Sequence, residues 1–271
     1  MKKLLLILLP LPIFGFGQNV NIPDSSFKAY LVGNKAINTN RDKEIQISEA
    51  SAFNDTIDCR DMSISNLKGI EAFTTLTYLD CKGNQLTSLD VSKNTALTYL
   101  SCDRNQLTSL DVSGASALTD LICINNKLKR LDVSKNIALT VLDCSYNPLT
   151  SLDVSKNSTL YSLLCYANQL ISLNISGATA LSWLNCGGNQ LTSLDLSKNS
   201  ALTELGCFNN QFSSLDLSKN TSLTWLNCVE NQLSSLDLSR NTSLTYLECG
   251  ENKFDCTALK SKYGITDPIG E

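Results

Sequence analysis

Aspartates recur along the chain at a spacing that could place carboxylates side by side. The series advances in steps of 21 residues, with Asn174 as its one break: Asp90, Asp111, Asp132, Asp153, Asp195, Asp216 and Asp237. Two carboxylates about 5 Å apart can hydrolyse a glycosidic bond, one as acid and one as nucleophile. That reaction needs a pocket and one raised pKa, and a flat, repeated surface supplies neither. We predict no catalytic residue and no enzyme, with a glycan-active enzyme as the remote alternative.

Cysteines follow the same spacing. Ten of the eleven form one column, and Cys256 lies outside it: Cys59, Cys81, Cys102, Cys123, Cys144, Cys165, Cys186, Cys207, Cys228 and Cys249. Neighbouring strands would hold their Cβ atoms about 4.7–4.9 Å apart, farther than the 3.5–4.5 Å of a disulfide. No CxxC spacing indicates a metal–thiolate site. We expect buried free thiols that fill the core, and a Cys249–Cys256 pair remains an open alternative.

A loop near the N-terminus carries oxygen-bearing residues at intervals suited to calcium. Relative positions 1, 3, 5, 7 and 12 are occupied by Asn38, Asn40, Asp42, Glu44 (through its backbone carbonyl) and Glu49. The pattern resembles an EF-hand loop, but Asn38 replaces an aspartate and Lys43 replaces the glycine of the sharp turn. Calcium is therefore a possible cofactor, and an EF-hand-like cap that binds no metal is the preferred interpretation. No other cofactor is expected.

Composition and the N-terminus limit the class of protein. The 271 residues include no histidine and have a formal net charge of −4, which disfavours nucleic acid and anionic membrane surfaces as partners. Lys2 and Lys3 precede an apolar run that ends near Gly17 and is too short to span a bilayer. We predict a signal peptide over residues 1–17, no membrane insertion, and a secreted or cell-surface location on a bacterium.

A 21-residue unit recurs from Leu76, where it reads LTYLDCKGNQLTSLDVSKNTA, through the coil that begins at Leu244. The pattern LxxLxCxxNxL resembles the leucine-rich repeat, with Cys81 where that family usually has a third leucine. Both halves of the unit read LTxLDxxxN, which resembles a nested bacterial subclass of the family. The resemblance covers residues 57–254 and implies a non-enzymatic interaction module.

The repeat predicts a β-rich solenoid of about ten coils, with short parallel strands on two faces, slight curvature and small helical caps at both ends. Residues two apart share one side of a strand, so Leu79 and Cys81 point inward together, as do Leu89 and Val91. Asn84, Asn94 and their equivalents lie at the turns, where stacked amides could bond one another and the backbone. We predict an N-terminal cap over residues 18–56, the solenoid over residues 57–254, and a C-terminal helix and tail over residues 255–271.

The first strand of each coil is where the repeats differ most. Its predicted outward positions hold aromatic and aliphatic residues, including both tryptophans of the chain: Tyr78, Tyr99, Ile122, Ile124, Val141, Leu164, Tyr166, Trp183, Phe208, Trp225 and Tyr246. Exposed aromatic residues on a sheet are typical energetic anchors of interfaces. We predict that this face binds a protein or glycan partner. The alternatives are chance variation at exposed positions, and a structural stalk or fragment of a larger surface protein.

Overall fold

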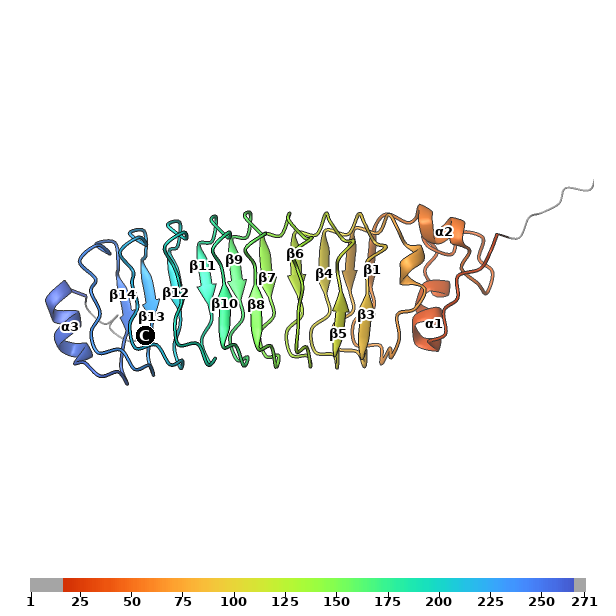
Figure 1. Ribbon diagram of the computed structural model, residues 1–271. Coiled ribbons are helices and arrows are strands. Elements are labelled where there is room, and N and C mark those ends of the chain that lie inside the picture. Colours follow the sequence, from red (N-terminus) through yellow and green to blue (C-terminus); the bar gives the residue numbers. More distant parts are fainter. Residues whose placement is uncertain (1–16, 266–271) are drawn as a thin grey trace, which may run out of the picture.

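The computed structural model describes residues 17–265, so the predicted signal peptide lies outside this range apart from Gly17. The chain winds into an elongated solenoid with helices at both ends (Figure 1). This confirms the predicted fold class. No helix within the described range is long and apolar enough to cross a bilayer.

One continuous parallel sheet runs the length of the solenoid. It has ten strands, one from each coil, and each pairs with its neighbour without a shift in register. The strands are β1 (Thr56–Asp58), β2 (Tyr78–Asp80), β4 (Tyr99–Ser101), β6 (Asp120–Ile122), β7 (Val141–Asp143), β9 (Ser162–Leu164), β11 (Trp183–Asn185), β12 (Glu204–Gly206), β13 (Trp225–Asn227) and β14 (Tyr246–Glu248). Equivalent residues of successive coils therefore form straight rows across the sheet.

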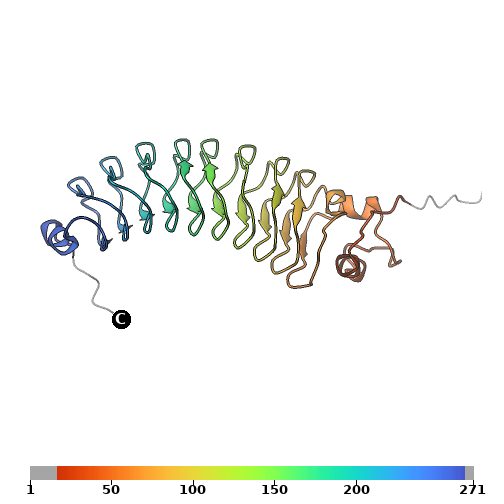
Figure 2. The ribbon, with the colours of Figure 1, turned by 60° about the horizontal axis from the view of Figure 1, so that its bottom comes forward.

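The second half of the coil forms strands less regularly than the sequence predicts. Within the described residues, only four coils have a second strand, in the pairs β3 (Ser88–Asp90) with β5 (Ser109–Asp111), and β8 (Ser151–Asp153) with β10 (Ser172–Asn174). The solenoid is also an arc, with the ten-stranded sheet on its inner, concave side (Figure 2). Because the coils fan apart on the convex side, a continuous hydrogen-bonded ladder is harder to keep there.

The core is a stack of leucine layers with a cysteine column beside them. Leu79, Cys81, Leu86 and Val91 have no exposed surface, and neither do most of their equivalents along the array. At about 0.8 kcal/mol for each buried CH₂, this stacking is the main driving force for folding. The predicted inward set is confirmed.

Nine column cysteines, from Cys59 to Cys228, are buried and free, as the strand spacing predicts. Burial raises the pKa of each thiol, to about 12 for Cys59, Cys186 and Cys228. The tenth, Cys249, forms a disulfide with Cys256. The prediction of a free thiol is therefore wrong for this one cysteine, because Cys256 approaches it from outside the strand column.

The asparagines after the first strand form a ladder that ties each coil to the one before it. Asn126 is typical: its Nδ2 donates to the carbonyls of Cys102, Cys123 and Ile124, and its Oδ1 accepts from the Leu107 amide. The expectation that stacked amides bond one another is not met. Every bond that these side chains make goes to backbone, because the turn leaves backbone groups of two adjacent coils without strand partners.

Two further ladders follow the array. In the second turn, the Asn157 amide donates to the carbonyls of Val133 and Asn136, one coil earlier. Ahead of the first strand, the Thr119 hydroxyl donates to the Thr98 carbonyl of the preceding coil, and the same bond recurs at most threonines of that row. The threonine ladder was not predicted, although the signal is visible as a repeated threonine directly after the leading leucine.

The N-terminal cap covers the open end of the core. Helix α1 (Ser25–Gly33) begins after the N-cap residue Asp24, whose Oδ1 accepts from the Phe27 amide. Its Oδ2 accepts from the amide and the hydroxyl of Ser65 on the solenoid. The Tyr30 hydroxyl accepts from the Asp58 amide in β1. Helix α2 (Ile47–Ala52) begins at the end of the candidate calcium loop, and a single 3-10 turn, η1 (Ile70–Ala72), lies in the first coil.

The C-terminal cap is one helix, α3 (Cys256–Tyr263). Asp255 caps it by accepting from the Ala258 amide, and Gly264 ends it with a left-handed φ of +67°. The Cys249–Cys256 disulfide fixes the start of this helix to the last strand. Both ends of the sheet are thus covered, which protects unpaired strand edges from aggregation.

Candidate binding face

The outward side of the concave sheet is built from three rows of side chains. Each strand contributes one residue to the first row and one to the second, and the residue after the cysteine forms the third. The structure places all eleven predicted face residues on this side, and each is exposed or half-buried. Trp183 is the most open, with 43% of its surface exposed.

Neighbouring rings in the first row lie against each other. Tyr78 and Tyr99 are stacked with ring centroids 4.2 Å apart, and Trp225 and Tyr246 are stacked at 5.4 Å. Because the rings are stacked along the solenoid at nearly the strand spacing, their planes are roughly perpendicular to its long axis and their edges point to solvent. Stacking restricts the ring rotamers, so less entropy is lost when a partner docks.

Carboxylates share this face with the aromatic rings. Asp58, Asp80, Asp103, Asp120, Asp143, Glu204 and Glu248 occupy outward positions, against two cations, Arg60 and Lys82. Arg60 pairs with Asp58 at 2.7 Å and with Asp80 at 3.4 Å, and Lys82 pairs with Asp103 at 3.1 Å. Both cations therefore form ion pairs at the N-terminal end of the sheet, and the charged residues in the rest of the three rows are acidic.

Two of these carboxyls have raised pKa values. Burial raises the pKa of Asp143, although the Ser145 amide donates to it, and burial also raises the pKa of Asp80. They lie in β7 and β2, three strand spacings or roughly 14 Å apart. The two raised carboxyls are therefore too far apart to act on each other as a pair.

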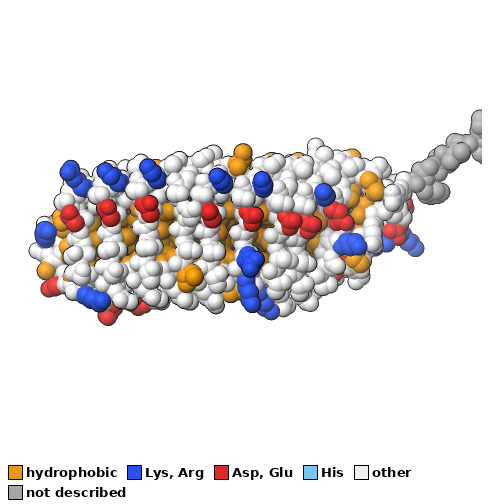
Figure 3. Space-filling model, viewed as in Figure 1, with side chains coloured by type: hydrophobic (Ala, Val, Ile, Leu, Met, Phe, Trp, Pro, Cys, Tyr) orange, Lys and Arg blue, Asp and Glu red, His pale blue; other side chains and the backbone are white. Residues whose placement is uncertain are grey.

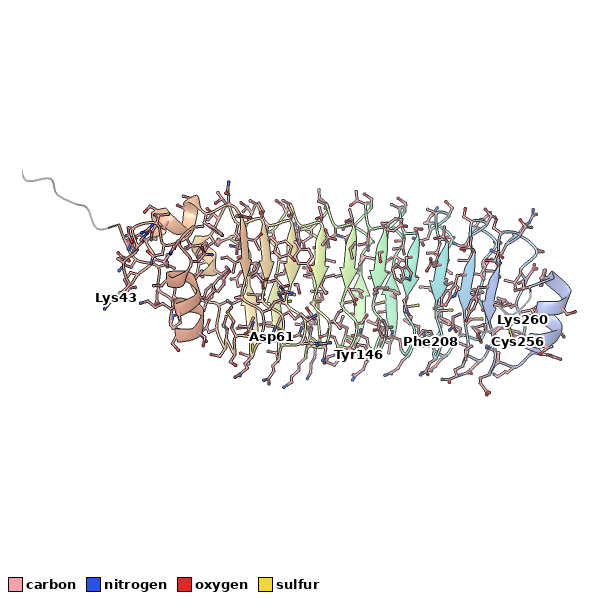
Figure 4. The ribbon with its side chains drawn as sticks, turned by 180° about the vertical axis from the view of Figure 1, so that it is seen from behind. Lys43, Asp61, Tyr146, Phe208, Cys256 and Lys260 are labelled. Atoms are coloured by element: carbon pink, nitrogen blue, oxygen red, sulfur yellow. A yellow bond between two sulfur atoms is a disulfide. The ribbon has the colours of Figure 1, made fainter. Side chains whose placement is uncertain are left out.

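The turn after the third row adds residues that the sequence analysis missed. Tyr146 is 52% exposed and makes an edge-to-face contact with Tyr166 at 5.0 Å. Figure 4 shows Tyr146 and Phe208 along the same edge of the sheet. The acidic residues Asp120 and Glu204 were missed as well, because only apolar residues were sought, although they occupy the same repeat position as Trp183.

The convex face carries the aspartate column, and its carboxylates act as turn caps. In each coil of the series the Asp Oδ1 accepts from the amide of the serine two residues later, as Asp153 does from Ser155 at 2.8 Å. These bonds lower the pKa of Asp111, Asp132, Asp153, Asp195, Asp216 and Asp237. Figure 3 shows the carboxylates as a row, with a parallel row of lysine and arginine side chains beside it.

In the candidate calcium loop, hydrogen-bond donors of the protein occupy most of the candidate ligand oxygens. Glu49 Oε1 accepts from the Thr39 amide and hydroxyl and from the Asn40 amide. Both carboxylate oxygens of Asp42 accept bonds within the loop, and the Glu44 side chain pairs with Lys28 at 2.7 Å. Among the predicted side-chain ligands, only Asn38 Oδ1 is buried without a partner.

Calcium needs six to eight oxygens directed at one point. Within the described residues, no three Asp, Glu, Cys or His side chains converge in that way. Because protein donors already occupy the Asp42 and Glu49 carboxylates, the loop is arranged as a hydrogen-bonded cap, and calcium binding stays a hypothesis for experiment.

We expect about 2 mM calcium to leave the melting temperature within about 1 °C of its value in a chelator. A ligand raises the melting temperature only when it binds the folded state, and we expect no calcium to bind there. Isothermal calorimetry of the parent protein should show no heat of binding. Binding heat that disappears in both Asp42→Ala and Glu49→Ala would restore the calcium hypothesis.

Several solved structures are similar to this chain. The functional domain of InlJ from Listeria monocytogenes, which includes a cysteine ladder, is 40% identical with a TM-score of 0.79; the match covers 90% of this chain and 55% of that one. The chain thus spans about half the length of that domain. The internalin inlF from Listeria monocytogenes is 23% identical over 93% of this chain and 83% of its own, with a TM-score of 0.65, which shows a shared fold alone.

A TLR13–ssRNA13 complex is also similar, at 25% identity over 69% of this chain and 31% of the other, with a TM-score of 0.58. No protein-family model and no curated protein sequence matches the chain. The match to the InlJ domain extends over 90% of this chain, and both proteins have a ladder of cysteines. The chain is therefore a leucine-rich repeat protein, similar along nearly its whole length to a bacterial domain that also includes a cysteine ladder.

Proposed function

We propose that the protein is a non-enzymatic binding scaffold that recognises a protein partner through the concave sheet. The observation that carries this proposal is the row of rings left open to solvent, with Trp183 at 43% exposure and Trp225 stacked on Tyr246. Exposed tryptophan and tyrosine on a rigid sheet are favourable anchors, because they desolvate a large area with little loss of side-chain freedom. A glycan is the second ligand class that such rings could bind.

A nucleic acid partner is disfavoured by charge. The TLR13 structure holds single-stranded RNA, but the three rows of this face hold seven carboxylates, four of them exposed or half-buried, against two cations that are both paired. Phosphate binding depends on an excess of lysine and arginine. The proposal therefore excludes nucleic acid from the concave face.

Catalysis by the convex aspartates is disfavoured because their lowered pKa values keep them ionised. Hydrogen bonds from serine amides hold the pKa of Asp132 and Asp153 below the usual range. A glycosidase of the two-carboxylate type needs one carboxyl that keeps its proton near neutral pH. These side chains are better explained as supports of the turns.

We propose that the protein acts outside the cytoplasm. The predicted signal peptide and the Cys249–Cys256 disulfide both fit export to an oxidising compartment. The nine remaining thiols are compatible with that location, because they are buried and protonated and so react slowly.

Replacing Trp183 and Trp225 with alanine tests the binding face. Each substitution is expected to weaken partner binding by about 30-fold, the effect of removing an interface anchor of about 2 kcal/mol. Binding would be measured on arrays of secreted proteins and of glycans, with the parent protein as reference.

The matched control is a double substitution of exposed aliphatic residues away from the concave sheet, Ile137→Ala with Ile171→Ala, which are 61% and 66% exposed. Control binding should equal that of the parent. A passive stalk would show no specific binding in the parent, or binding that is indifferent to both tryptophans, and either result would contradict the proposal.

A further inference from the structure

One carboxylate of the concave face lies between the two tryptophans of the chain. In-register pairing places Glu204 of β12 directly beside Trp183 of β11 on one side and Trp225 of β13 on the other. Glu204 is exposed, and within residues 17–265 its carboxylate makes no hydrogen bond or ion pair. Two strand spacings, roughly 9–10 Å, separate the tryptophan backbones, and Glu204 lies between them.

Within the described residues, no aromatic ring stacks on the Trp225 indole from the side of Glu204. Tyr246 stacks on its other side, with the two ring planes 7° from parallel, and Tyr246 belongs to the strand on the far side of β13 from Glu204. The face of an aromatic ring is electronegative. A carboxylate beside an indole face therefore attracts a cation and repels an anion.

The second row behind Glu204 offers hydrogen-bond donors, and the Asn185 amide group lies over the buried Gly206. Gly206 has no side chain, and a Cβ there would meet the Asn185 amide group at 3.1 Å. Asn185 and Asn227 flank Gly206, and their Oδ1 atoms accept from the amides of Gly187 and Val229. Their Nδ2 groups make no hydrogen bond within the described chain, so they can donate to peptide carbonyls.

We propose that Trp183, Glu204 and Trp225 form a subsite for an arginine side chain of the partner protein. A guanidinium is planar, pairs with a carboxylate through two parallel hydrogen bonds, and stacks on indole. The acidic balance of the face favours a basic segment along the rest of the sheet. This inference rests on the proposed function and adds to it the chemistry of the ligand.

A short synthetic peptide, GRGRG, tests the subsite, because both tryptophans report on it through their fluorescence. Titration at low ionic strength is expected to change the tryptophan emission of the parent protein saturably. The same peptide with citrulline in place of arginine keeps the shape and loses the charge, and it should bind at least tenfold more weakly.

Glu204→Gln is expected to weaken binding of the arginine peptide about tenfold, the loss of one charge-assisted pair. Asp216→Asn is the matched control, since it removes the same charge from the convex face and Asn174 already occupies the equivalent position while accepting the same serine bond. Binding to this control should stay within twofold of the parent.

Three results would overturn the inference: no change in the parent's emission, equal binding of the citrulline peptide, or equal weakening by both substitutions, which would indicate diffuse attraction to net charge. If the arginine peptide fails while array binding still depends on the tryptophans, the subsite is wrong and the proposed function stands. Tryptophan-dependent binding confined to glycans would reject the basic protein partner.

Discussion

Raising the pH from 8 to 9.5 is expected to unfold this protein, because nine buried thiols must keep their protons in the folded state. All nine cysteines from Cys59 to Cys228 are buried, and burial raises the pKa of each, to about 12 for Cys59, Cys186 and Cys228. The same thiols in an unfolded chain ionise near 8.5. The folded and unfolded states therefore bind different numbers of protons between these two values.

The sign follows from the direction of the shift. Below about pH 8.5 both states hold the thiol protons, and the stability from the buried column is fully present. Above it the unfolded state loses protons that the folded state keeps, so unfolding becomes more favourable as the pH rises. One pH unit above 8.5, each thiol contributes about 1.4 kcal/mol and the nine together about 12 kcal/mol, which is comparable to the whole stability of a typical domain.

The measurement is the urea midpoint followed by circular dichroism at several pH values, without oxygen so that no new disulfides form. The midpoint should fall steeply above pH 8.5 and recover when the pH returns to 7. Cys186→Ala removes one titrating group, and it should reduce the slope of the unfolding free energy by about 1 kcal/mol per pH unit near pH 9.5. A midpoint that is flat up to pH 9.5 would show that the thiols are not held in this way.

Much of this architecture could be predicted from the sequence, because the repeat states the same local rule many times. Leu79 and Cys81 lie two apart in an extended segment, so both must face the same side, and the stacked copies can only bury that side against each other. The caps were also visible, since Asp24 and Asp255 are strong N-cap residues and Gly264 suits the left-handed end of a helix.

What could not be predicted depends on distances between coils. The curvature and the interrupted convex strands follow from how closely the two sides of each coil pack, which a repeat pattern does not state. The disulfide of Cys249 depends on where the turn before α3 brings Cys256. Glu204 was missed because only apolar residues were sought, whereas its proposed role depends on the two tryptophans 21 residues away on either side.

Asn126→Ala is expected to destabilise the protein by about 3 kcal/mol, a large loss for one side chain. Asn126 is 8% exposed and makes four bonds to backbone, three to carbonyls and one from the Leu107 amide. Its removal leaves backbone groups of two adjacent coils buried without partners, and each such group costs roughly 1–3 kcal/mol, partly relieved by water. Because coils are stabilised by their neighbours, damage in the middle of the array weakens both halves.

The adjacent residue supplies the control for this prediction. Asn125 is exposed and has a φ of +53°, and Ala167 occupies the equivalent turn position with a φ of +52°, so Asn125→Ala places alanine where the fold already accepts it. Its free energy of unfolding, measured by urea titration, should lie within about 0.5 kcal/mol of that of the parent. Equal loss in both variants would mean that the turn needs asparagine for its backbone conformation. A loss confined to Asn126→Ala assigns the effect to the amide ladder, which then joins the leucine stack as a second source of cohesion between coils.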